Sequence, residues 1–287
     1  SFNKDVTDSA AGGTAIATGA NTYYGAVGVN SDTVKVPSIL ELAEAKGLST
    51  GMVTTCDLTD ATPAAFVAHQ KSRYMLEEVA RDYLNTDVDI VIGGGLNYFA
   101  NRSDGQSLLP FLEERDYTII TDIAELSKSK DQKIFALIAD KGLPRAIDRR
   151  SYLTSATKIA LSRLEQNDKG FFLMIEGSQI DWAGHENHTG HIIEEVLDLD
   201  RAIGVALEFA ADKGQTLIIC TADHETGGMS LESGNVAAGE LRADYTGGDH
   251  TGVMVPVYSI GPGAEEFIGI YENTVLFDKM TSLLDLK

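Results

Sequence analysis

Short apolar runs alternate with longer amphipathic segments along this chain. Several of the apolar runs are continuous rather than alternating, which is typical of parallel strands covered on both faces. The runs predict strands at 51–56, 88–92, 133–138, 171–175, 215–221 and 253–260. The amphipathic segments predict helices at 9–19, 37–46, 62–84, 151–166, 190–212 and 274–285. Strands that alternate with helices predict an α/β fold: a doubly wound, mostly parallel central sheet with helices on both faces.

The domain organisation is expected to be simple. The sequence has no internal repeat, no low-complexity tract and no Pro/Gly linker, so residues 1–287 predict a single domain with ample length for a core. The stretch from about 101 to 150 is more polar, and we interpret it as an excursion from that domain. Cys56 and Cys220 each lie in a strand-like run and are predicted to be buried thiols.

Composition excludes several classes of protein. Lys plus Arg is 23 and Asp plus Glu is 43, which gives a net charge of −20 and argues against a nucleic-acid-specific binder. No apolar run approaches the roughly 18 residues of a membrane span. With 43% hydrophobic residues the chain is not a disordered protein. An anionic substrate would need a local source of positive charge in so acidic a molecule.

Polar clusters occur next to the predicted strands, where ligands gather in open α/β sheets. They span 57–63, 176–185, 221–225 and 247–252. Three of the six histidines lie in these clusters beside carboxylates. Asp, Glu and His without Cys suit zinc held by nitrogen and oxygen, together with a harder cation on oxygen.

The spacing inside the clusters favours metal binding. Asp181 and His185 are four residues apart, so one helical turn can direct both at one ion. Asp223 and His224 are adjacent at a strand end, and His250 lies among glycines that permit close approach of the loop. A single Asp–His pair is usually only a hydrogen-bonded pair, but several at strand ends together indicate a metal centre.

Two further residues have both a structural and a catalytic interpretation. Ser9 stands where a helix begins, as a simple N-cap or as a nucleophile whose substrate phosphate meets the helix N-terminus. No Ser-His-Asp arrangement is evident near it, so its activation would need a metal ion. Arg73 is either a solvated charge on a helix or a bidentate clamp on phosphate oxygens.

Five segments, in the same chain order, resemble the alkaline phosphatase family. They are VTDSAAGGTAIATGANTYYGAVGV at 6–29, DATPAAFVAHQKSR at 60–73, EGSQIDWAGHENH at 176–188, TADHETGG at 221–228 and GDHTG at 248–252. The resemblance covers nearly the whole chain. It implies phosphate monoester hydrolysis through a phosphoserine intermediate, at a site with two Zn²⁺ and one Mg²⁺.

The resemblance also implies a role for individual residues. Ser9 matches the nucleophile and Arg73 the phosphate-binding arginine. The implied metal ligands are Asp181, His185 and His250 for the first zinc, Asp223 and His224 for the second, and Thr62 and Glu176 for magnesium. Asp60 and Trp182 fall at positions that tune the magnesium surroundings. His188 and His191 match no ligand position and are expected on a helix surface, and HENH is not the HExxH of zincins.

One departure from the family pattern concerns its first βα unit, whose Asp bridges the second zinc and the magnesium. Nothing similar precedes Asp8, so we expect that unit to be missing and an unpaired slot to remain in the sheet. We also expect graded metal binding, with the first zinc tightest and magnesium weakest, and little activity of the isolated chain.

Alternatives to the phosphatase remain open. The chain is alternatively a non-catalytic fragment, a zinc- or phosphate-binding pseudoenzyme, or a related phosphodiesterase, although the last typically has Thr as its nucleophile. Ser9 lacks the Ser-x-Pro-x-Arg context of a sulfatase. The resemblance implies small phosphomonoester substrates, inorganic phosphate as a product, a homodimer, and a periplasmic or secreted location, although no signal peptide is visible at Ser1.

Overall fold

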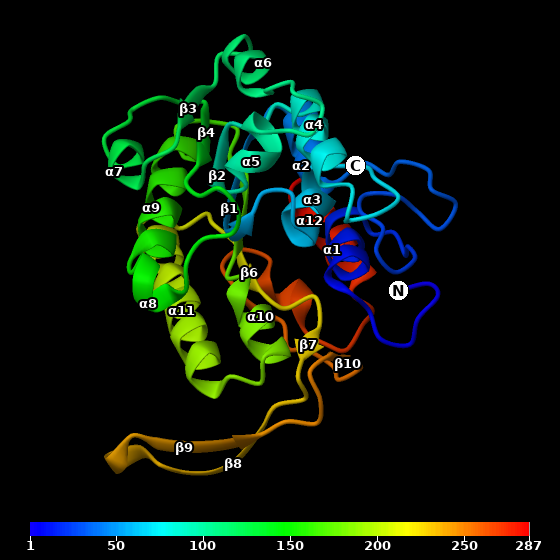
Figure 1. Ribbon diagram of the computed structural model, residues 1–287, viewed down its shortest axis with the longest axis vertical. Helices are drawn as coiled ribbons and strands as arrows, with labels where there is room; N and C mark the ends of the chain where they lie inside the picture. Colours follow the sequence, from blue (N-terminus) through cyan, green and yellow to red (C-terminus); the bar gives the residue numbers. More distant parts are fainter. Residues whose placement is uncertain (287) are drawn as a thin grey trace.

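The computed structural model describes residues 1–286, built around a twisted parallel sheet (Figure 1). The sheet has the order β3-β4-β2-β1-β5, and all of its neighbouring strands are parallel. Its strands are β1 (Ser49–Asp57), β2 (Ile90–Gly94), β3 (Thr118–Ile120), β4 (Ile134–Leu137) and β5 (Phe171–Glu176). The mostly parallel sheet predicted from the sequence is therefore confirmed.

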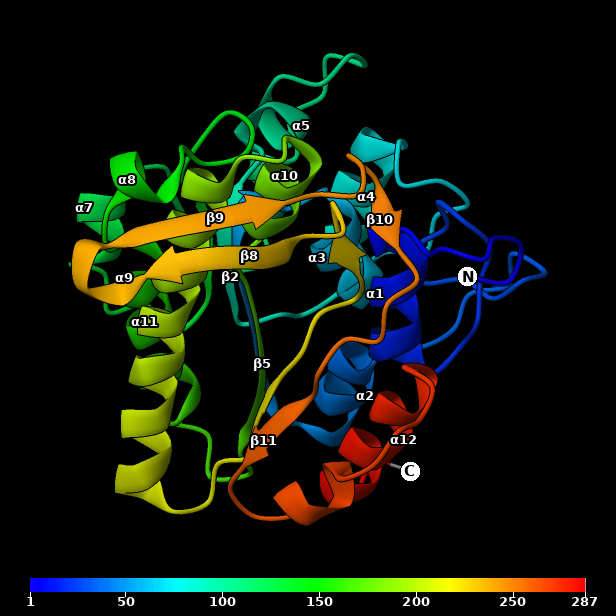
Figure 2. The same cartoon turned by 90° about the horizontal axis from the view of Figure 1, so that it is seen from below.

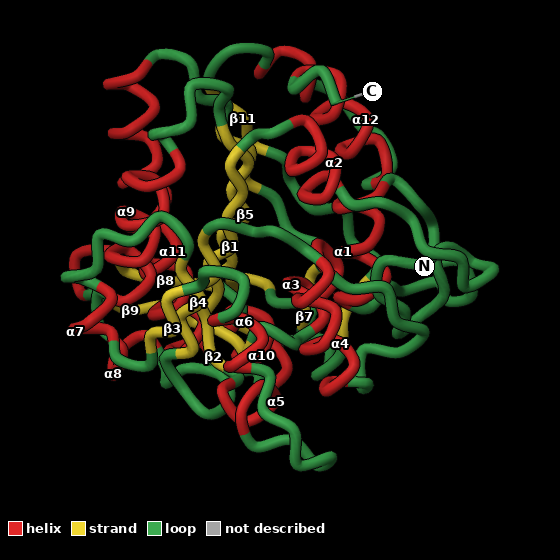
Figure 3. Tube along the Cα trace, turned by 90° about the horizontal axis from the view of Figure 1, so that it is seen from above, coloured by secondary structure: helices red, strands yellow, loops and turns green. Residues whose placement is uncertain are grey.

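Helices cover both faces of this sheet, with α9 and α11 on one side and α1, α2, α3 and α12 on the other (Figures 1 and 3). The helices of the first half are α1 (Ser9–Thr18), α2 (Ile39–Lys46), α3 (Ala61–Val67), α4 (Leu76–Asp82), α5 (Leu96–Ala100), α6 (Leu109–Glu113), α7 (Ile123–Leu126) and α8 (Ala146–Arg149). Those of the second half are α9 (Tyr152–Leu164), α10 (Gln179–His185), α11 (Thr189–Lys213) and α12 (Thr274–Leu283). Short 3₁₀ turns are η1 (Tyr83–Asn85), η2 (Val236–Ala238) and η3 (Ala264–Phe267).

Alternation along the strands fills a core on each face of the sheet. Met52 and Val91 join the core that includes the α2 and α3 side chains, whereas Val53 and Ile92 join the core under α9. Both faces are therefore apolar, which explains the continuous apolar runs in the sequence.

The remaining strands form three antiparallel pairs outside this sheet. They are β6 (Ile218–Cys220) with β11 (Tyr258–Ile260), β7 (Glu225–Thr226) with β10 (His250–Thr251), and β8 (Ser230–Asn235) with β9 (Glu240–Asp244). The β8–β9 hairpin extends away from the body of the molecule, and almost all of its side chains are exposed (Figures 1 and 2). Within residues 1–286, no helix has both the length and the apolar character needed to cross a membrane.

Three sequence predictions need correction. The single helix expected at 62–84 ends at Val67 and resumes at Leu76, because Ala68 turns extended and Gln70 forms a β-bridge with Val27. The strand expected at 253–260 is formed only at its end, as β11. The polar stretch 101–150 contributes both β3 and the predicted β4 to the edge of the sheet, so it is more than an excursion.

Candidate active site

The N-terminus of α1 places Ser9 at the centre of the polar cluster. Asp8 caps the helix by accepting from the Ala11 amide at 3.2 Å, and its carboxylate also accepts from the Gly25 amide at 3.1 Å. Ser9 begins the helix, and its Oγ lies 2.9 Å from His224 Nε2. Both Asp8 and Ser9 are buried, so the hydroxyl is held in one place.

A glycine in α1 lets this helix pack closely against the loop that carries Asp223 and His224. A Cβ on Gly12 would lie only 3.0 Å from Asp223 Cβ and 3.1 Å from its carbonyl oxygen. Glycine is therefore required by packing rather than by backbone conformation at this position. This contact brings Asp223 and His224, which follow β6, against the first turn of α1.

Asp181, His185 and His250 converge at one point. His185 Nε2 and His250 Nε2 are each 3.4 Å from Asp181 Oδ1 and 3.1 Å from each other. Asp181 and His185 lie one turn apart on α10, as their spacing predicted, and His250 begins β10. The His224 ring stacks on the His250 ring with centroids 3.5 Å apart, and Asp181, His224 and His250 form a group that could hold a metal ion.

Backbone carbonyls bound to the Nδ1 atoms of His185 and His250 determine that the Nε2 atoms face the cluster. His185 Nδ1 lies 2.7 Å from the Gly248 carbonyl and His250 Nδ1 lies 2.8 Å from the Thr7 carbonyl. A carbonyl can only accept, so each Nδ1 carries a proton and, in the neutral ring, each Nε2 presents a lone pair. Hydrogen bonds of this kind, on the ring nitrogen that faces away from the cluster, orient histidines that bind metals.

Thr226 connects the remaining histidine to the carboxylate, a role that the sequence analysis missed. Its hydroxyl donates to Asp181 Oδ1 at 2.5 Å and lies 3.2 Å from His224 Nδ1. The hydroxyl has one proton, so it accepts from His224 Nδ1–H and leaves His224 Nε2 as an acceptor toward Ser9. The signal available in the sequence was only that Thr226 lies two residues beyond His224.

The surroundings of His250 and Asp181 favour positive charge within the cluster. Burial lowers the pKa of His250, but Asp181 and the Thr7 carbonyl raise it further, and the net pKa is raised. Burial works to raise the pKa of Asp181, but hydrogen bonds from His250 and Thr226 and the neighbouring histidines lower it to about 2. Closely spaced acceptors of this kind need positive charge among them.

Arg73 faces the same pocket from the turn between α3 and α4. Its guanidinium contacts Asp60 Oδ1 at 2.8 Å and Asp8 Oδ2 at 3.5 Å, and 22% of its side chain is exposed. It is therefore not a solvated helix charge. Asp60 also caps α3 through the Ala61 amide, so these two carboxylates fix Arg73 beside Ser9.

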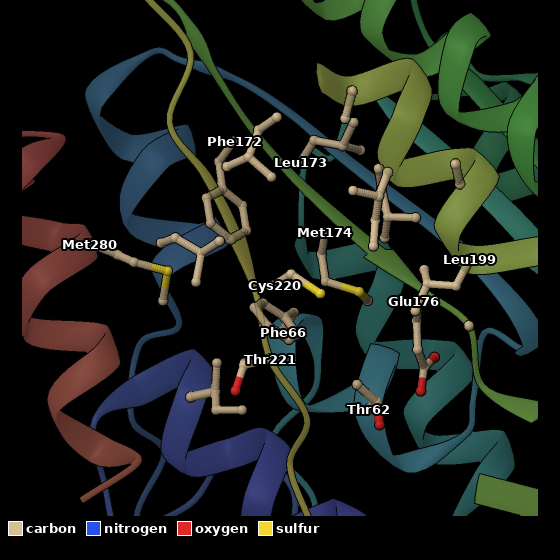
Figure 4. Close-up of a pocket in the computed structure, with 18 of the residues that line it drawn as sticks. Thr62, Phe66, Phe172, Leu173, Met174, Glu176, Leu199, Cys220, Thr221 and Met280 are labelled. Carbon is tan, nitrogen blue, oxygen red and sulfur yellow. The ribbon is translucent and has the colours of Figure 1, made fainter. Parts of the chain in front are cut away.

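Thr62 and Glu176 both line one large cavity near the site and are drawn in Figure 4. Thr54 donates to Glu176 Oε2 at 2.7 Å, and the Cys56 thiol lies 3.4 Å from the same oxygen. Burial raises the pKa of Glu176 to about 7, because the Thr54 hydrogen bond does not offset the loss of water. A buried carboxylate of this kind is stabilised by a cation, and the sequence analysis did not identify Thr54 as its partner.

The other predicted residues lie around this centre or outside it. Trp182 is on α10, and its ring packs against Gly142, where a Cβ would meet it at 2.6 Å. His188 and His191 lie away from the cluster, but His191 is buried at 4% exposure, contrary to the helix-surface prediction. Cys56 is buried as predicted, whereas Cys220 is only partly buried.

Known proteins with similar sequences belong to one enzyme family. Residues 1–245 match the family model described as Alkaline phosphatase. Alkaline phosphatase 4 of Bacillus subtilis is 36% identical, over 94% of this chain and 75% of the relative. Alkaline phosphatase of Escherichia coli is 32% identical, over 98% of this chain and 74% of the relative.

A solved structure shows the same fold. The alkaline phosphatase of the Antarctic bacterium TAB5 superposes with a TM-score of 0.93 and 42% identity, over 99% of this chain and 86% of that one. The family match, the identity to named enzymes and the shared fold agree with one another. The chain belongs to the alkaline phosphatase family, whose members are phosphomonoester hydrolases.

Proposed function

We propose that this chain hydrolyses phosphate monoesters through a phosphoserine on Ser9, with two Zn²⁺ and one Mg²⁺ held by the surrounding acidic and histidine side chains. The observation that carries the proposal is the cluster of inward-facing acceptors from Asp181, His185 and His250, which lie within 3.4 Å of one another. Such a set favours a zinc ion more than any neutral ligand.

The resemblance to the family divides the donor set into three parts. Asp181, His185 and His250 supply one nitrogen- and oxygen-based zinc site, and Asp223 and His224 supply a second beside Ser9. Asp223 Oδ2 lies 3.2 Å from His224 Nε2 and accepts no hydrogen bond from the described residues, and this supports the second site because a buried carboxylate oxygen without a hydrogen bond is costly. Thr62 and Glu176 offer oxygen ligands that suit magnesium, and a variant of the TAB5 enzyme has been described with Mg bound in its M3 site.

When bound, these cations would supply positive charge that lowers the pKa of an attacking hydroxyl and stabilises a departing alkoxide. The chain's own residues perform the rest. Ser9 Oγ attacks phosphorus, the ester oxygen leaves, and the phosphoryl group becomes attached to Ser9. Water then attacks the phosphoserine and releases inorganic phosphate with regeneration of the hydroxyl.

The phosphate oxygens meet two sets of donors near Ser9. The amides of Ser9 and Ala10 at the start of α1 have no intrahelical acceptor and lie at the positive end of the helix dipole, whereas the Ala11 amide donates to Asp8. Arg73 offers a planar fork of donors and is held by Asp8 and Asp60 rather than free to rotate. Together they orient the substrate and stabilise the negative charge in the transition state.

Two assignments follow from the resemblance to the family rather than from the site. We propose that the protein acts outside the cytoplasm, in the periplasm or as a secreted enzyme, and that it forms a homodimer. Light scattering on purified protein tests the second point, since a monomer at all concentrations would contradict it.

Turnover of p-nitrophenyl phosphate in the presence of Zn²⁺ and Mg²⁺ tests the function. We expect Ser9→Ala to abolish turnover, and Ser233→Ala in the exposed hairpin to leave it unchanged. Arg73→Lys removes the fork but keeps the charge, so we expect kcat/KM to fall roughly 10- to 100-fold, the value of one or two charge-assisted hydrogen bonds. Mass spectrometry after an acid quench should locate a phosphoryl group on Ser9.

The alternatives give different results in the same assay. A non-catalytic binder would bind inorganic phosphate in calorimetry but release no product from any ester. A phosphodiesterase would prefer bis-(p-nitrophenyl) phosphate to the monoester. Unchanged monoester turnover by Ser9→Ala would refute the phosphoserine mechanism.

A further inference from the structure

Two exposed tyrosines lie next to the arginine of the candidate active site. Tyr24 is in the connection from α1 to α2, and Tyr74 directly follows Arg73 in the connection from α3 to α4. Both connections lie on the same side of the molecule as the N-terminus (Figures 1 and 2). The two tyrosines are 45% and 79% exposed, so neither ring belongs to the core.

Backbone hydrogen bonds bring the two connections together. Val27 and Gln70 form an antiparallel bridge in which each amide donates to the other carbonyl at 3.0 Å. Closer to the site, the Arg73 amide donates to the Gly25 carbonyl at 2.6 Å. Each tyrosine is the chain neighbour of one partner in this last hydrogen bond. The two tyrosines therefore lie beside each other, one from each connection.

The carboxylate of Asp8 ties this pair of segments to the catalytic serine. It accepts from the Gly25 amide at 3.1 Å and lies 3.5 Å from the Arg73 guanidinium. Asp8 immediately precedes Ser9 at the N-terminus of α1. The backbone that carries Tyr24 is thus fixed to the residue before the nucleophile, and Tyr74 follows the arginine that faces the same pocket.

The side chains of both tyrosines have unused binding capacity. Within residues 1–286, neither phenol hydroxyl makes a hydrogen bond, and the one ring contact is the Lys4 ammonium, 6.0 Å from the Tyr24 ring centroid. Burial, followed by the charges of Asp8 and Tyr74, raises the pKa of Tyr24. The Tyr24 phenol therefore stays neutral in mildly alkaline solution and does not repel a phosphate there.

We propose that Tyr24 and Tyr74 bind the base of a nucleoside 5′-monophosphate whose phosphate is held at Ser9 and Arg73. This inference rests on the proposed function and names a substrate class for it. Aromatic side chains stack on any nucleobase, because every base has a π-face. The rings belong to residues one position beyond Gly25 and Arg73, so a base that is set back from its phosphate by a ribose suits this offset. A saturated leaving group offers no face for stacking.

Calorimetry on the Ser9→Ala protein with Zn²⁺ and Mg²⁺ measures binding without turnover. The probes are adenosine 5′-monophosphate and ribose 5-phosphate, which carry the same phosphate on the same ribose carbon and differ in the base. We expect the nucleotide to bind roughly 5- to 150-fold more tightly, the range observed for stacking of one base on an aromatic side chain. The ratio of the two dissociation constants is the quantity compared among variants.

Variants separate stacking from other effects. Tyr24→Leu with Tyr74→Leu removes both rings and should bring the ratio close to 1, whereas Tyr24→Phe with Tyr74→Phe keeps the rings and should keep the ratio. Phe111→Leu is the matched control, since Phe111 is 47% exposed on α6, which lies apart from α1 in Figure 1. Tyr74→Leu alone, at the more exposed residue, should lower the ratio and serves if the double variant does not fold.

Several outcomes would overturn the proposal. Equal binding of the two probes by the Ser9→Ala protein would show that the base is not recognised. An unchanged ratio in the leucine variants would place the base elsewhere, and a ratio lost in the phenylalanine variants would assign recognition to the hydroxyls. A dimer that dissociates in the leucine variants, with the ratio unchanged, would make the pair a contact between copies of the chain.

The active protein gives a second readout. The ratio of kcat/KM for the nucleotide to kcat/KM for ribose 5-phosphate should follow the calorimetric ratio across the same variants, because both esters release a ribose 5′-oxygen. A protein that turns over neither ester would refute the proposed hydrolysis, whereas the calorimetric comparison would still decide whether the tyrosines bind the base.

Discussion

Arg149 holds a buried ionic cluster between α8 and α11, and its removal should destabilise the fold strongly. Its side chain is 2% exposed, and the Glu195 and Asp198 side chains that it contacts are fully buried. It also donates to the Pro144 carbonyl at 2.9 Å. We consider the substitution Arg149→Met, which keeps much of the apolar stem and removes the charge.

The size of the loss in stability depends on the ion pairs and hydrogen bonds that Asp198 and Glu195 keep when Arg149 is replaced. Asp198 keeps Arg201 at 3.2 Å, whereas Glu195 keeps only the Ala146 amide at 2.8 Å and the nearby His191. Breaking a buried ion pair from one side costs about 3–5 kcal/mol, because the other charge stays buried and uncompensated. We therefore expect the free energy of unfolding to fall by that amount, and the urea midpoint by about 1 M or more.

Equilibrium unfolding in urea, followed by fluorescence, measures this effect. Arg242→Met removes an exposed pair with Asp244 and should cost less than about 0.5 kcal/mol. The triple variant Arg149→Met, Glu195→Leu, Asp198→Leu should lie within about 1 kcal/mol of the parent, because all the buried charges of the cluster are removed together. A cost below about 1 kcal/mol for Arg149→Met alone would refute the reasoning, since another cation would then have replaced the guanidinium.

Three further predictions concern other parts of the molecule. Burial raises the pKa of Glu44 from 4.5 to about 7, so the contribution of this carboxyl to stability is present below pH 4.5 and is lost as the pH rises to 7. Glu44→Gln should therefore stabilise the protein by about 1–2 kcal/mol above pH 7 and should have no effect below pH 4.5. Thermal unfolding measured at each pH tests this. Thr226→Val removes the hydroxyl that orients Asp181, so zinc affinity measured by competition with a chelator should fall about tenfold, and Thr226→Ser should restore it. Gly12→Ala would usually stabilise a helix by about 1 kcal/mol, but its Cβ would lie 3.0 Å from Asp223 Cβ, so we expect lower kcat without a gain in Tm, and unchanged kcat would contradict this packing argument.

Much of the fold follows from apolar periodicity. Runs such as 88–92 and 171–175 became β2 and β5, because a strand covered on both faces needs an uninterrupted apolar sequence. The strand β3 escaped prediction, since Thr118–Ile120 is only three residues long within a polar stretch. The break between α3 and α4 also escaped, because it depends on pairing with Val27, some forty residues away in the chain.

The site was predictable as far as its chemistry is local. Asp181 and His185 share a helical turn, so their convergence follows from spacing alone. The groups that orient the histidines are not local, since the Gly248 carbonyl fixes His185 and the Thr7 carbonyl fixes His250. Any residue type offers a carbonyl, so no sequence pattern can mark these partners.

His185 and His191 show why burial could not be predicted from the same segment. They lie six residues apart among similar polar neighbours, yet the His185 side chain is 39% exposed and the His191 side chain is 5% exposed. His191 lies 3.4 Å from Glu195, one turn further along α11, and Glu195 is itself buried in an ion pair with Arg149 of α8. A polar helix face that the sequence predicts to be exposed is therefore buried where its carboxylates pair with a cation from a distant segment, as Glu195 and Asp198 do with Arg149. The acidic face of α11 is therefore partly a structural counter-charge, and the net charge of −20 overstates how much of that acidity faces solvent.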